Sequence, residues 1–252
     1  MAHIKLHIPG PVEVSDKTFQ AFRSPMIGHR GQGFKDLYAK MQLQLQSLFC
    51  TKQLVYLSTS SAWGVMEGAI RNLAAKKVLC CMCGAFSDKW LDVSKRGGKE
   101  AEPLQVDWGS PIRADAVDAK LATGQFDALT LIHNETSTGT MSPLAEIAAL
   151  KKKYPYVMFI VDAVSSLSAI KIEFDALGID VLLAGTQKAL AITWETWPAF
   201  TYNCGGQKKV CRKRGQKEIE QPSKRSGFVK DIIPVSAVTI TGDFQKNANR
   251  LS

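Results

Sequence analysis

Short apolar runs alternate with amphipathic segments along the middle of this chain, from about residue 50 to residue 192. Runs of mainly apolar residues bounded by turn residues predict buried strands, and apolar positions spaced three or four apart predict helices. We expect strands at 53–59, 76–83, 101–108, 127–135, 157–166 and 180–185. Helices are expected in between, at 62–74, 87–97, 113–124 and 142–155.

Two of these helices carry recognisable start signals. Ser87 is a plausible N-cap of the second predicted helix, and Ser142 of the fourth. Pro143 would then occupy the first helical position, and Pro155 lies just beyond the expected end.

The order of elements predicts an α/β fold. Strands that are continuously apolar and alternate with helices are typical of a mainly parallel sheet covered by helices on both faces. In such sheets ligands bind at the carboxyl ends of the strands. Candidate chemistry is therefore sought at those ends.

Composition and charge divide the chain into two parts. The 252 residues include 45% apolar residues and carry a formal net charge of +9, of which residues 1–192 contribute +3 and residues 193–252 contribute +6. The second part shows no helical stripe or clear alternation, apart from a possible strand in "DIIPVSAVTITGDF". Its basic run at 208–230 could contact phosphates, but a solvated, disordered segment is favoured and nucleic acid is not an expected partner.

No membrane span or secretion signal is evident, because no apolar run is long enough and the start "MAHIKLHIPGPVEVS" lacks an apolar core. We therefore expect a cytoplasmic protein. Among six cysteines, Cys80, Cys81 and Cys83 fall in "VLCCMCG" at the end of a predicted strand. No second Cys/His pair lies at zinc spacing, so buried cysteines are favoured over a metal site, and no metal is expected.

The predicted strand ends collect reactive residues, each of which has a plain explanation when taken alone. Lys188 in "AGTQKAL" could be an exposed residue of the next helix, but a desolvated lysine can form a Schiff base with a carbonyl. Asp162 ends a very apolar strand, where it could cap a turn or hold a cationic partner.

Two further strand ends are rich in hydroxyl residues. "STSSAWG" opens a helix, and helix starts with free N–H groups bind phosphate, although many such turns are simply Ser-rich. "HNETSTG" places Thr136 and its neighbours at another strand end. A phosphate site, a carboxylate for an aromatic nitrogen and a lysine for a carbonyl together match the protein requirements of pyridoxal phosphate.

The chain resembles the class V aminotransferases of pyridoxal-phosphate fold type I, the serine–pyruvate, serine–glyoxylate and alanine–glyoxylate group. The resemblance runs from residue 4 to about 191, in family order, through "IPGPVEVS", "MIGHRGQGFKDLY", "STSSAWGVMEGAIRN", "GAFSDKW", "HNETSTGTMSPL" and "VDAVSSLSAIKIEFDALGIDVLLAGTQKAL". It implies that residues 1–192 form the cofactor-binding large domain.

The resemblance also implies a role for individual residues. Lys188 would hold the cofactor aldehyde as an internal aldimine, and Asp162 would pair with the pyridine nitrogen. Gln187 and the turn Ser61, Ala62 and Trp63 would hold the cofactor phosphate. Phe86 and Val164 would cover the two faces of the ring, and Thr136 would lie near the ring oxygen.

The implied activity is transamination. An amino group would pass from serine or alanine to a 2-oxo acid such as pyruvate or glyoxylate, with freed Lys188 as general base and acid. The family implies a homodimer with sites at the interface. Donor and acceptor cannot be chosen from these residues.

The chain departs from the family pattern in two places. Ala62 stands where many relatives have Gly. After about residue 191 the family's small C-terminal domain, with its arginine for the substrate carboxylate, has no counterpart in "ITWETWPAFTYNCGGQKKVCRKRG". Residues 193–252 are therefore unassigned, and a reading-frame shift or a divergent terminus would explain them.

Two other functions stay open at this point. A cysteine desulfurase or another class V lyase needs a catalytic cysteine on a later loop, and Cys204 and Cys211 lack a matching context. A non-catalytic remnant of the cofactor domain, with a basic tail, is the alternative that involves no reaction at all.

Overall fold

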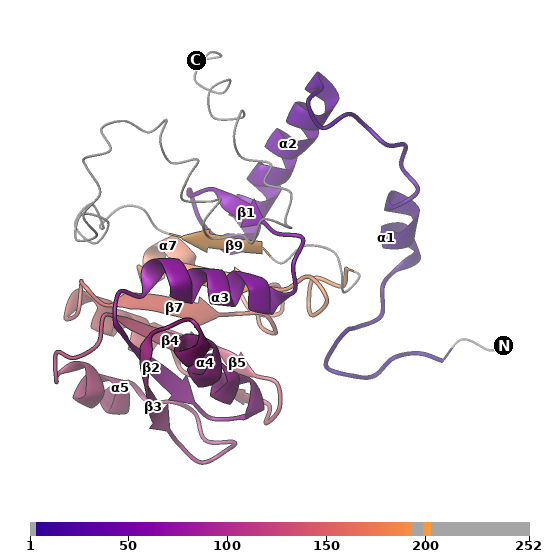
Figure 1. Ribbon diagram of the computed structural model, residues 1–252. Coiled ribbons are helices and arrows are strands. Elements are labelled where there is room, and N and C mark those ends of the chain that lie inside the picture. The colour runs from indigo at the N-terminus through magenta and orange to yellow at the C-terminus, as the bar shows by residue number, and fades with distance from the viewer. Residues whose placement is uncertain (1–3, 193–198, 203–252) are drawn as a thin grey trace, which may run out of the picture.

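The computed structural model describes residues 4–192 and 199–202 (Figure 1). Its strands are β1 Val55–Leu57, β2 Lys77–Met82, β3 Glu100–Gln105, β4 Ala128–Ile132, β5 Asn134–Glu135, β6 Thr140–Met141, β7 Met158–Asp162, β8 Val181–Ala184 and β9 Ala199–Tyr202. Its helices are α1 Asp16–Ala21, α2 Gln32–Phe49, α3 Ala62–Leu73, α4 Ala85–Arg96, α5 Ala114–Leu121, α6 Leu144–Ala149 and α7 Phe174–Leu177, with a 3₁₀ turn at Leu150–Lys152.

Seven strands form one central sheet in the order β1-β9-β8-β7-β4-β2-β3. The pairs β2–β3, β2–β4, β4–β7 and β7–β8 are parallel, as the apolar strand pattern predicts. Strand β9 lies antiparallel to both β8 and β1. Because two antiparallel pairings reverse direction twice, β1 runs in the same direction as β8.

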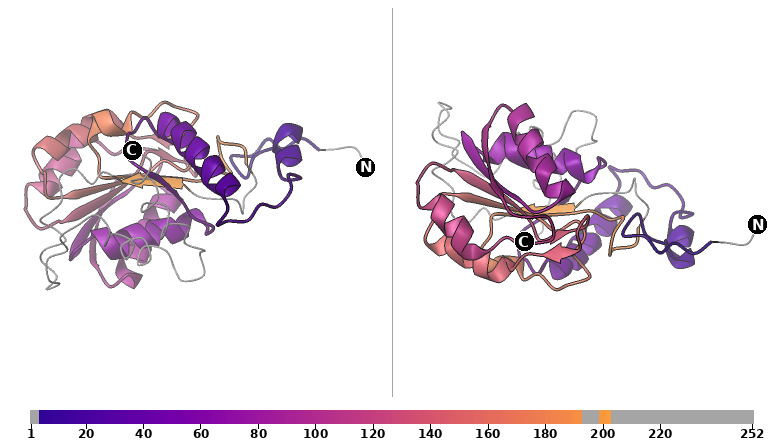
Figure 2. Two further views of the ribbon diagram at one scale, coloured as in Figure 1. Left: turned by 90° about the horizontal axis from the view of Figure 1, so that it is seen from above. Right: turned by 90° about the horizontal axis from the view of Figure 1, so that it is seen from below.

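Helices cover both faces of this sheet (Figure 2). On one face α3 and α4 pack onto alternate strand residues, with Ile70, Trp90 and Ile160 buried together. On the other face lie α2, α5, α6 and α7, and the core there includes Phe49 and Phe174. The two-sided burial explains why the strands read as continuous apolar runs.

The amino-terminal segment reaches away from the sheet and carries α1 (Figure 1). Several of its apolar side chains face solvent, including Met26 at 98% exposure. It approaches the sheet at the loop after β8, where the Val12 N–H donates to the carbonyl of Gln187 at 3.0 Å. That contact brings the beginning of the chain to the loop after β8.

Both predicted helix caps are wrong. Helix α4 begins two residues before Ser87, whose Oγ instead accepts hydrogen bonds from the N–H groups of Cys83 and Gly84. Ser142 precedes the cap position of α6, which Pro143 occupies, and its Oγ accepts from the Ile112 N–H. Ser87 thus stands at the third helical position and binds back to the N-cap residue Gly84, whereas Ser142 binds backbone from a separate segment.

Several predicted elements are shorter than expected, among them the strands expected over 53–59 and 157–166, which span Val55–Leu57 and Met158–Asp162. Two others are interrupted. The strand expected over 127–135 breaks at His133, and residues 134–135 pair with β6 in a separate two-stranded hairpin. Regular α-helix in the fourth predicted helix ends at Ala149, before the 3₁₀ turn. The six observed strands end one to four residues before the predicted ends, and the predicted site residues still lie at or soon after those ends.

Of the unassigned carboxyl-terminal part, residues 199–202 form β9, and its other predicted features lie outside the described residues. Within residues 4–192 and 199–202 no helix has the length and apolar character needed to cross a membrane. The division of the chain into residues 1–192 and 193–252 stays a prediction.

Candidate cofactor site

Five strands end at the same edge of the sheet and place the predicted residues there. The parallel strands β2, β4, β7 and β8 lead directly into Cys83, His133, Ala163 and Gly185. Strand β1 runs in the same direction and leads through a serine-rich turn into α3. The sheet therefore gathers segments that are far apart in the sequence at its carboxyl edge.

Lys188 lies in the irregular loop after β8, not in a helix, and its side chain is half-buried. Its Nζ donates to the carbonyl of Pro9 at 3.2 Å. Burial lowers the pKa of Lys188, and the negative charge of Asp162 partly opposes that shift. A lysine with a lowered pKa keeps more of its amine neutral, which is the form that attacks a carbonyl.

Asp162 ends β7 and is only 5% exposed. Burial raises the pKa of Asp162 to about 6, against a lowering by the Val164 N–H, which donates to Oδ1 at 2.9 Å. The indole N–H of Trp90 and the charge of Lys188 also lower it. The nearby donors and the charge of Lys188 do not fully offset the cost of burying this carboxylate, so a further cationic partner would be favourable.

The start of α3 is open to an anion. Ser61 is the N-cap residue, but its side chain makes no capping hydrogen bond within the described chain. The first N–H groups of a helix have no acceptor in the helix itself, so those of Ala62 and Trp63 are available to a ligand. Ala62 needs no glycine-like conformation there, because it is not among the residues with positive φ.

The start of α4 is, in contrast, fully occupied. Ser87 Oγ accepts from Cys83 and Gly84, Ser137 Oγ accepts from the Ala85 N–H at 3.0 Å, and the carboxylate of Glu135 accepts from the next two N–H groups. Of these two helix starts at the carboxyl edge, α3 is therefore the better site for a phosphate.

Gln187 and Val164 lie together beside Gly185. A Cβ atom at Gly185 would stand 2.5 Å from Gln187 Oε1 and 3.0 Å from Val164 Cγ1. The glycine thus leaves the space that both side chains use. Since the Val164 N–H also binds Asp162, these residues form one contiguous side of the site.

Phe86 and Trp63 both lie near the side chain of Lys89. The ammonium of Lys89 lies 5.1 Å from the Phe86 ring centroid and 5.9 Å from that of Trp63. The Trp63 ring lies 6.1 Å from that of Trp90, whose buried Nε1 makes no hydrogen bond of full geometry in the described part of the chain. Aromatic side chains thus connect the start of α3 with Asp162.

Thr136 lies in the hairpin after β4, where its hydroxyl shares a hydrogen bond of 2.5 Å with Ser165 Oγ. Next to it, Glu135 is fully buried and holds the start of α4. Neither Ser165 nor Glu135 is a residue that the sequence reasoning selected. A glutamate directly after a buried strand was the available signal, since such a carboxylate needs hydrogen-bond donors.

All nine predicted residues therefore lie at the carboxyl edge, at a strand end, at two helix starts or on loops. The arrangement offers helix N–H groups for an anion, a buried carboxylate for a cation, and a lysine of lowered pKa for an electrophilic carbonyl. A single ligand that carries an anionic group, a cationic group and a carbonyl could bind to all three. Their roles toward a cofactor are taken up below as proposals.

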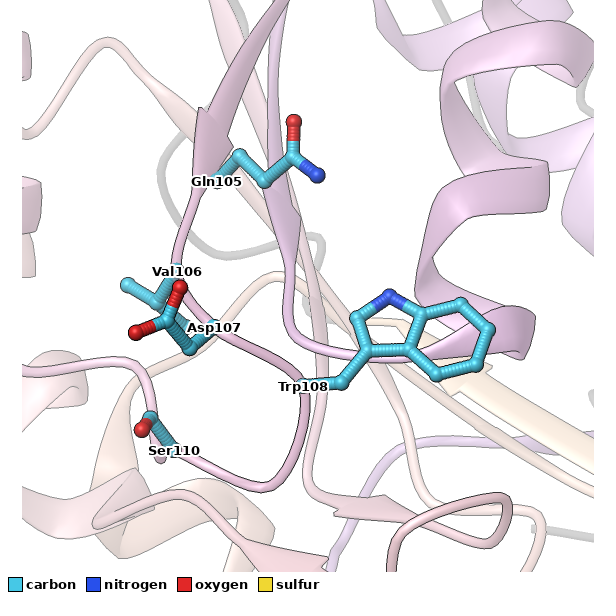
Figure 3. A pocket seen from close by; sticks show the side chains of 5 residues that line it. All are labelled: Gln105, Val106, Asp107, Trp108 and Ser110. Carbon is cyan, nitrogen blue, oxygen red and sulfur yellow. The ribbon is translucent and has the colours of Figure 1, made fainter.

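Other features of this edge do not contribute to the site. Cys80, Cys81 and Cys83 are buried free thiols, and no group of three or more potential metal ligands occurs among the residues described. A pocket after β3 is lined by Gln105, Val106, Asp107, Trp108 and Ser110 (Figure 3). It contains none of the predicted site residues.

Comparison with known proteins gives a consistent result. The sequence profile described as "Aminotransferase class-V" matches residues 18–193. An uncharacterized aminotransferase of Methanocaldococcus jannaschii is 36% identical over 191 residues, which cover 74% of this chain and 49% of that protein. L-aspartate–glyoxylate aminotransferase of Paracoccus denitrificans is 30% identical over 195 residues, with coverage of 74% and 49%.

A solved structure agrees. Alanine–glyoxylate aminotransferase from Nostoc sp. has a TM-score of 0.77 and 25% identity, and the match covers 86% of this chain and 59% of that one. The chain spans about half the length of the curated relatives it matches. A cysteine desulfurase shares only 14% identity, so it supports the fold alone, and the lyase alternative is not favoured.

Proposed function

Because the chain belongs to the class-V aminotransferase family, we propose that it functions as a transaminase that depends on pyridoxal phosphate. The proposed reaction moves an amino group from a small amino acid, serine or alanine, to a 2-oxo acid, pyruvate or glyoxylate. The observation that carries the proposal is the meeting of Lys188, Asp162 and the open start of α3 at one sheet edge.

The residues at this edge fit pyridoxal phosphate. When bound, this cofactor supplies an aldehyde that condenses with amines and a ring that accepts electrons. The N–H groups of Ala62 and Trp63, the hydroxyl of Ser61 and the amide of Gln187 would bind the phosphate. Phe86 and Val164 would cover the two ring faces, and Thr136 would approach the ring oxygen.

Asp162 would keep the ring nitrogen protonated. Its carboxylate is buried, and its pKa, raised to about 6, leaves it mostly ionised at pH 7. A cation beside it would lower that pKa further. The opposite charge would therefore favour the ionised carboxylate and the protonated ring together.

Lys188 would attach the cofactor and then move protons. Its lowered pKa makes the neutral amine available at Nζ, as a general base requires. The carbonyl of Pro9 accepts a hydrogen bond from the same nitrogen and would hold it whenever it is free. Lys188 is therefore the residue expected to carry both covalent attachment and proton transfer.

The test is titration of the full chain with pyridoxal phosphate, followed by borohydride reduction and peptide mass analysis. We expect a visible absorption band and a reduced adduct on Lys188, and neither in K188A. A chain that gains no band, or an adduct on surface lysines alone, would overturn the proposal.

Substrates are tested separately. Serine, alanine and aspartate are each added to the loaded protein, and conversion of the cofactor to its amine form is followed by absorbance. We also propose a homodimer, which sedimentation can measure. The cytoplasmic location stays a prediction.

A further inference from the structure

Glu135 is a buried carboxylate for which the proposed chemistry has no direct use. It follows β4 and is 0% exposed. Its Oε2 accepts from the Ser87 N–H at 2.8 Å, and its Oε1 accepts from Ser137 N–H at 3.1 Å and Ser137 Oγ at 2.8 Å. A longer contact of 3.4 Å joins Oε1 to the Phe86 N–H.

These donors come from two separate segments. Phe86 and Ser87 open α4, whereas Ser137 belongs to the hairpin between β5 and β6. The Glu135 side chain thus links the start of α4 to the hairpin, although Ser87 and Glu135 are 48 residues apart in the sequence. Each of these two segments carries a residue proposed to touch the cofactor, namely Phe86 and Thr136.

The packing leaves little freedom for this arrangement. A Cβ atom at Gly84 would stand 2.5 Å from Glu135 Cγ and 2.6 Å from Ser137 Oγ. The glutamate therefore crosses directly over the backbone where β2 turns into α4. Although burial opposes ionisation, the hydrogen bonds from Ser137 and Ser87 hold the pKa of Glu135 below its ordinary value.

We propose that Glu135 is a positioning residue, whose buried carboxylate fixes Phe86 and Thr136 relative to each other and so shapes the cofactor site. The proposal rests on the function proposed above. Glu135 need not touch the cofactor, since it acts through the backbone of two loops. Its removal should weaken cofactor binding more than a comparable structural carboxylate would.

The chain provides such a comparable carboxylate. Asp127 lies just before β4, at the opposite edge of the sheet, and accepts from the N–H groups of Ala75, Lys76 and Lys77 at 2.8, 2.6 and 3.0 Å. Like Glu135 it joins a helix–strand connection to β4. No predicted cofactor residue lies on its loops.

The experiment compares E135Q with D127N in the full chain. In E135Q the amide keeps the shape of the side chain but turns one acceptor into a donor that faces N–H groups. We expect its Kd for pyridoxal phosphate to rise at least about tenfold, with an altered circular dichroism of the bound cofactor. D127N should lose thermal stability and keep the wild-type Kd and cofactor spectrum.

A second variant guards against misfolding of E135Q. S137A removes one hydroxyl partner of Glu135 and leaves the carboxylate in place, so a smaller rise in Kd is expected. If E135Q and S137A are less stable but bind the cofactor as wild type does, Glu135 is only structural and the proposal is overturned.

Hydrogen exchange separates this proposal from the proposed function. Wild-type protein that takes up no pyridoxal phosphate would contradict the proposed function. In that case the link that Glu135 makes between the start of α4 and the hairpin is still tested by hydrogen exchange at the amides of Phe86, Ser87 and Ser137, which should become faster in E135Q. Unchanged exchange at all three amides would overturn the proposed positioning role as well.

Discussion

The two ends of strand β4 use the same chemistry for different purposes. At the amino edge of the sheet Asp127 accepts three backbone hydrogen bonds, and at the carboxyl edge Glu135 also accepts three, besides one from a hydroxyl. At the amino edge the bonded loops hold none of the predicted site residues. At the carboxyl edge they hold Phe86 and Thr136, and the Thr136 hydroxyl shares a hydrogen bond with Ser165, which follows Asp162 closely in the chain.

This difference teaches that a carboxylate that accepts several backbone hydrogen bonds is not by itself a functional signal, whether half-buried like Asp127 or fully buried like Glu135. A parallel sheet directs its strand ends, and so its ligand-binding loops, to one edge only. Carboxylates at the other edge join segments and contribute stability. Variants at the two edges should therefore separate stability from cofactor chemistry.

The largest effect is expected at the carboxyl edge, for K188A. Loss of Lys188 removes the amine that attaches the cofactor and moves protons, so transaminase activity should fall by about 10²–10⁴-fold. Thermal stability should change little, because within residues 4–192 and 199–202 the hydrogen bond of Nζ is to the carbonyl of Pro9. Steady-state rates and thermal melts of the same preparations check this. A variant that retains wild-type turnover would contradict the comparison.

At the amino edge, D180N should cost stability and leave the cofactor site intact. Asp180 is 5% exposed, and its Oδ2 binds Lys151 Nζ at 2.6 Å and the Phe159 N–H at 2.8 Å. Breaking such a pair leaves Lys151 partly buried without its counter-ion, which should lower the free energy of unfolding by about 3 kcal/mol. Urea denaturation measures the loss, and cofactor titration provides the control. A large rise in the Kd for pyridoxal phosphate would contradict the expectation that the amino edge contributes stability alone.

D162N should act in the opposite sense on stability. Because burial raises the pKa of Asp162 to about 6, the folded protein binds this proton more tightly than the unfolded chain does. The free energy of unfolding of the cofactor-free protein therefore falls as the pH rises from about 4 to about 6. At pH 7 the cofactor-free D162N should be more stable than wild type by up to about 3 kcal/mol.

The gain in D162N should disappear below about pH 4, where both states of the wild-type carboxyl are protonated. Cofactor affinity should meanwhile decrease, because the asparagine offers no charge to a ring nitrogen. Denaturation curves at several pH values test the first statement, and titration with pyridoxal phosphate tests the second. Equal stability of D162N and wild type at pH 7 would show that Asp162 is compensated in some other way.

The smallest effect is expected for G10A. Gly10 has a φ of +141°, and an added Cβ would collide with Cδ of Lys188. The unfavourable backbone alone should cost about 1–2 kcal/mol. The displaced amino-terminal segment should also slow attachment of the cofactor to Lys188, which stopped-flow absorbance can follow. Unchanged attachment would mean that Pro9 and Gly10 do not help to orient this lysine.

Much of the fold could be predicted because its signals are local. Strands β2, β4, β7 and β8 are apolar runs between turn residues, and their covering helices are amphipathic over the predicted segments. The cap predictions failed because Ser87 binds back to the N-cap residue Gly84 from the third helical position, and because the Ser142 hydroxyl binds the Ile112 N–H. A short polar side chain can serve either purpose, and its sequence context does not distinguish them.

The sequence by itself determined the α/β architecture, the family and the group of residues around Lys188 and Asp162. Strand periodicity, strand order along the chain and short motifs are all properties of contiguous residues. They are present before the chain has folded.

Only the tertiary structure decided which distant segments meet. It places β9 antiparallel between β1 and β8, lays Pro9 against Lys188 across 179 residues, and gives Glu135 its donors from α4. A hydrogen bond between such segments depends on the path of the whole chain. A buried carboxylate needs donors wherever it lies, and only the folded sheet shows whether those donors belong to a scaffold or to a site.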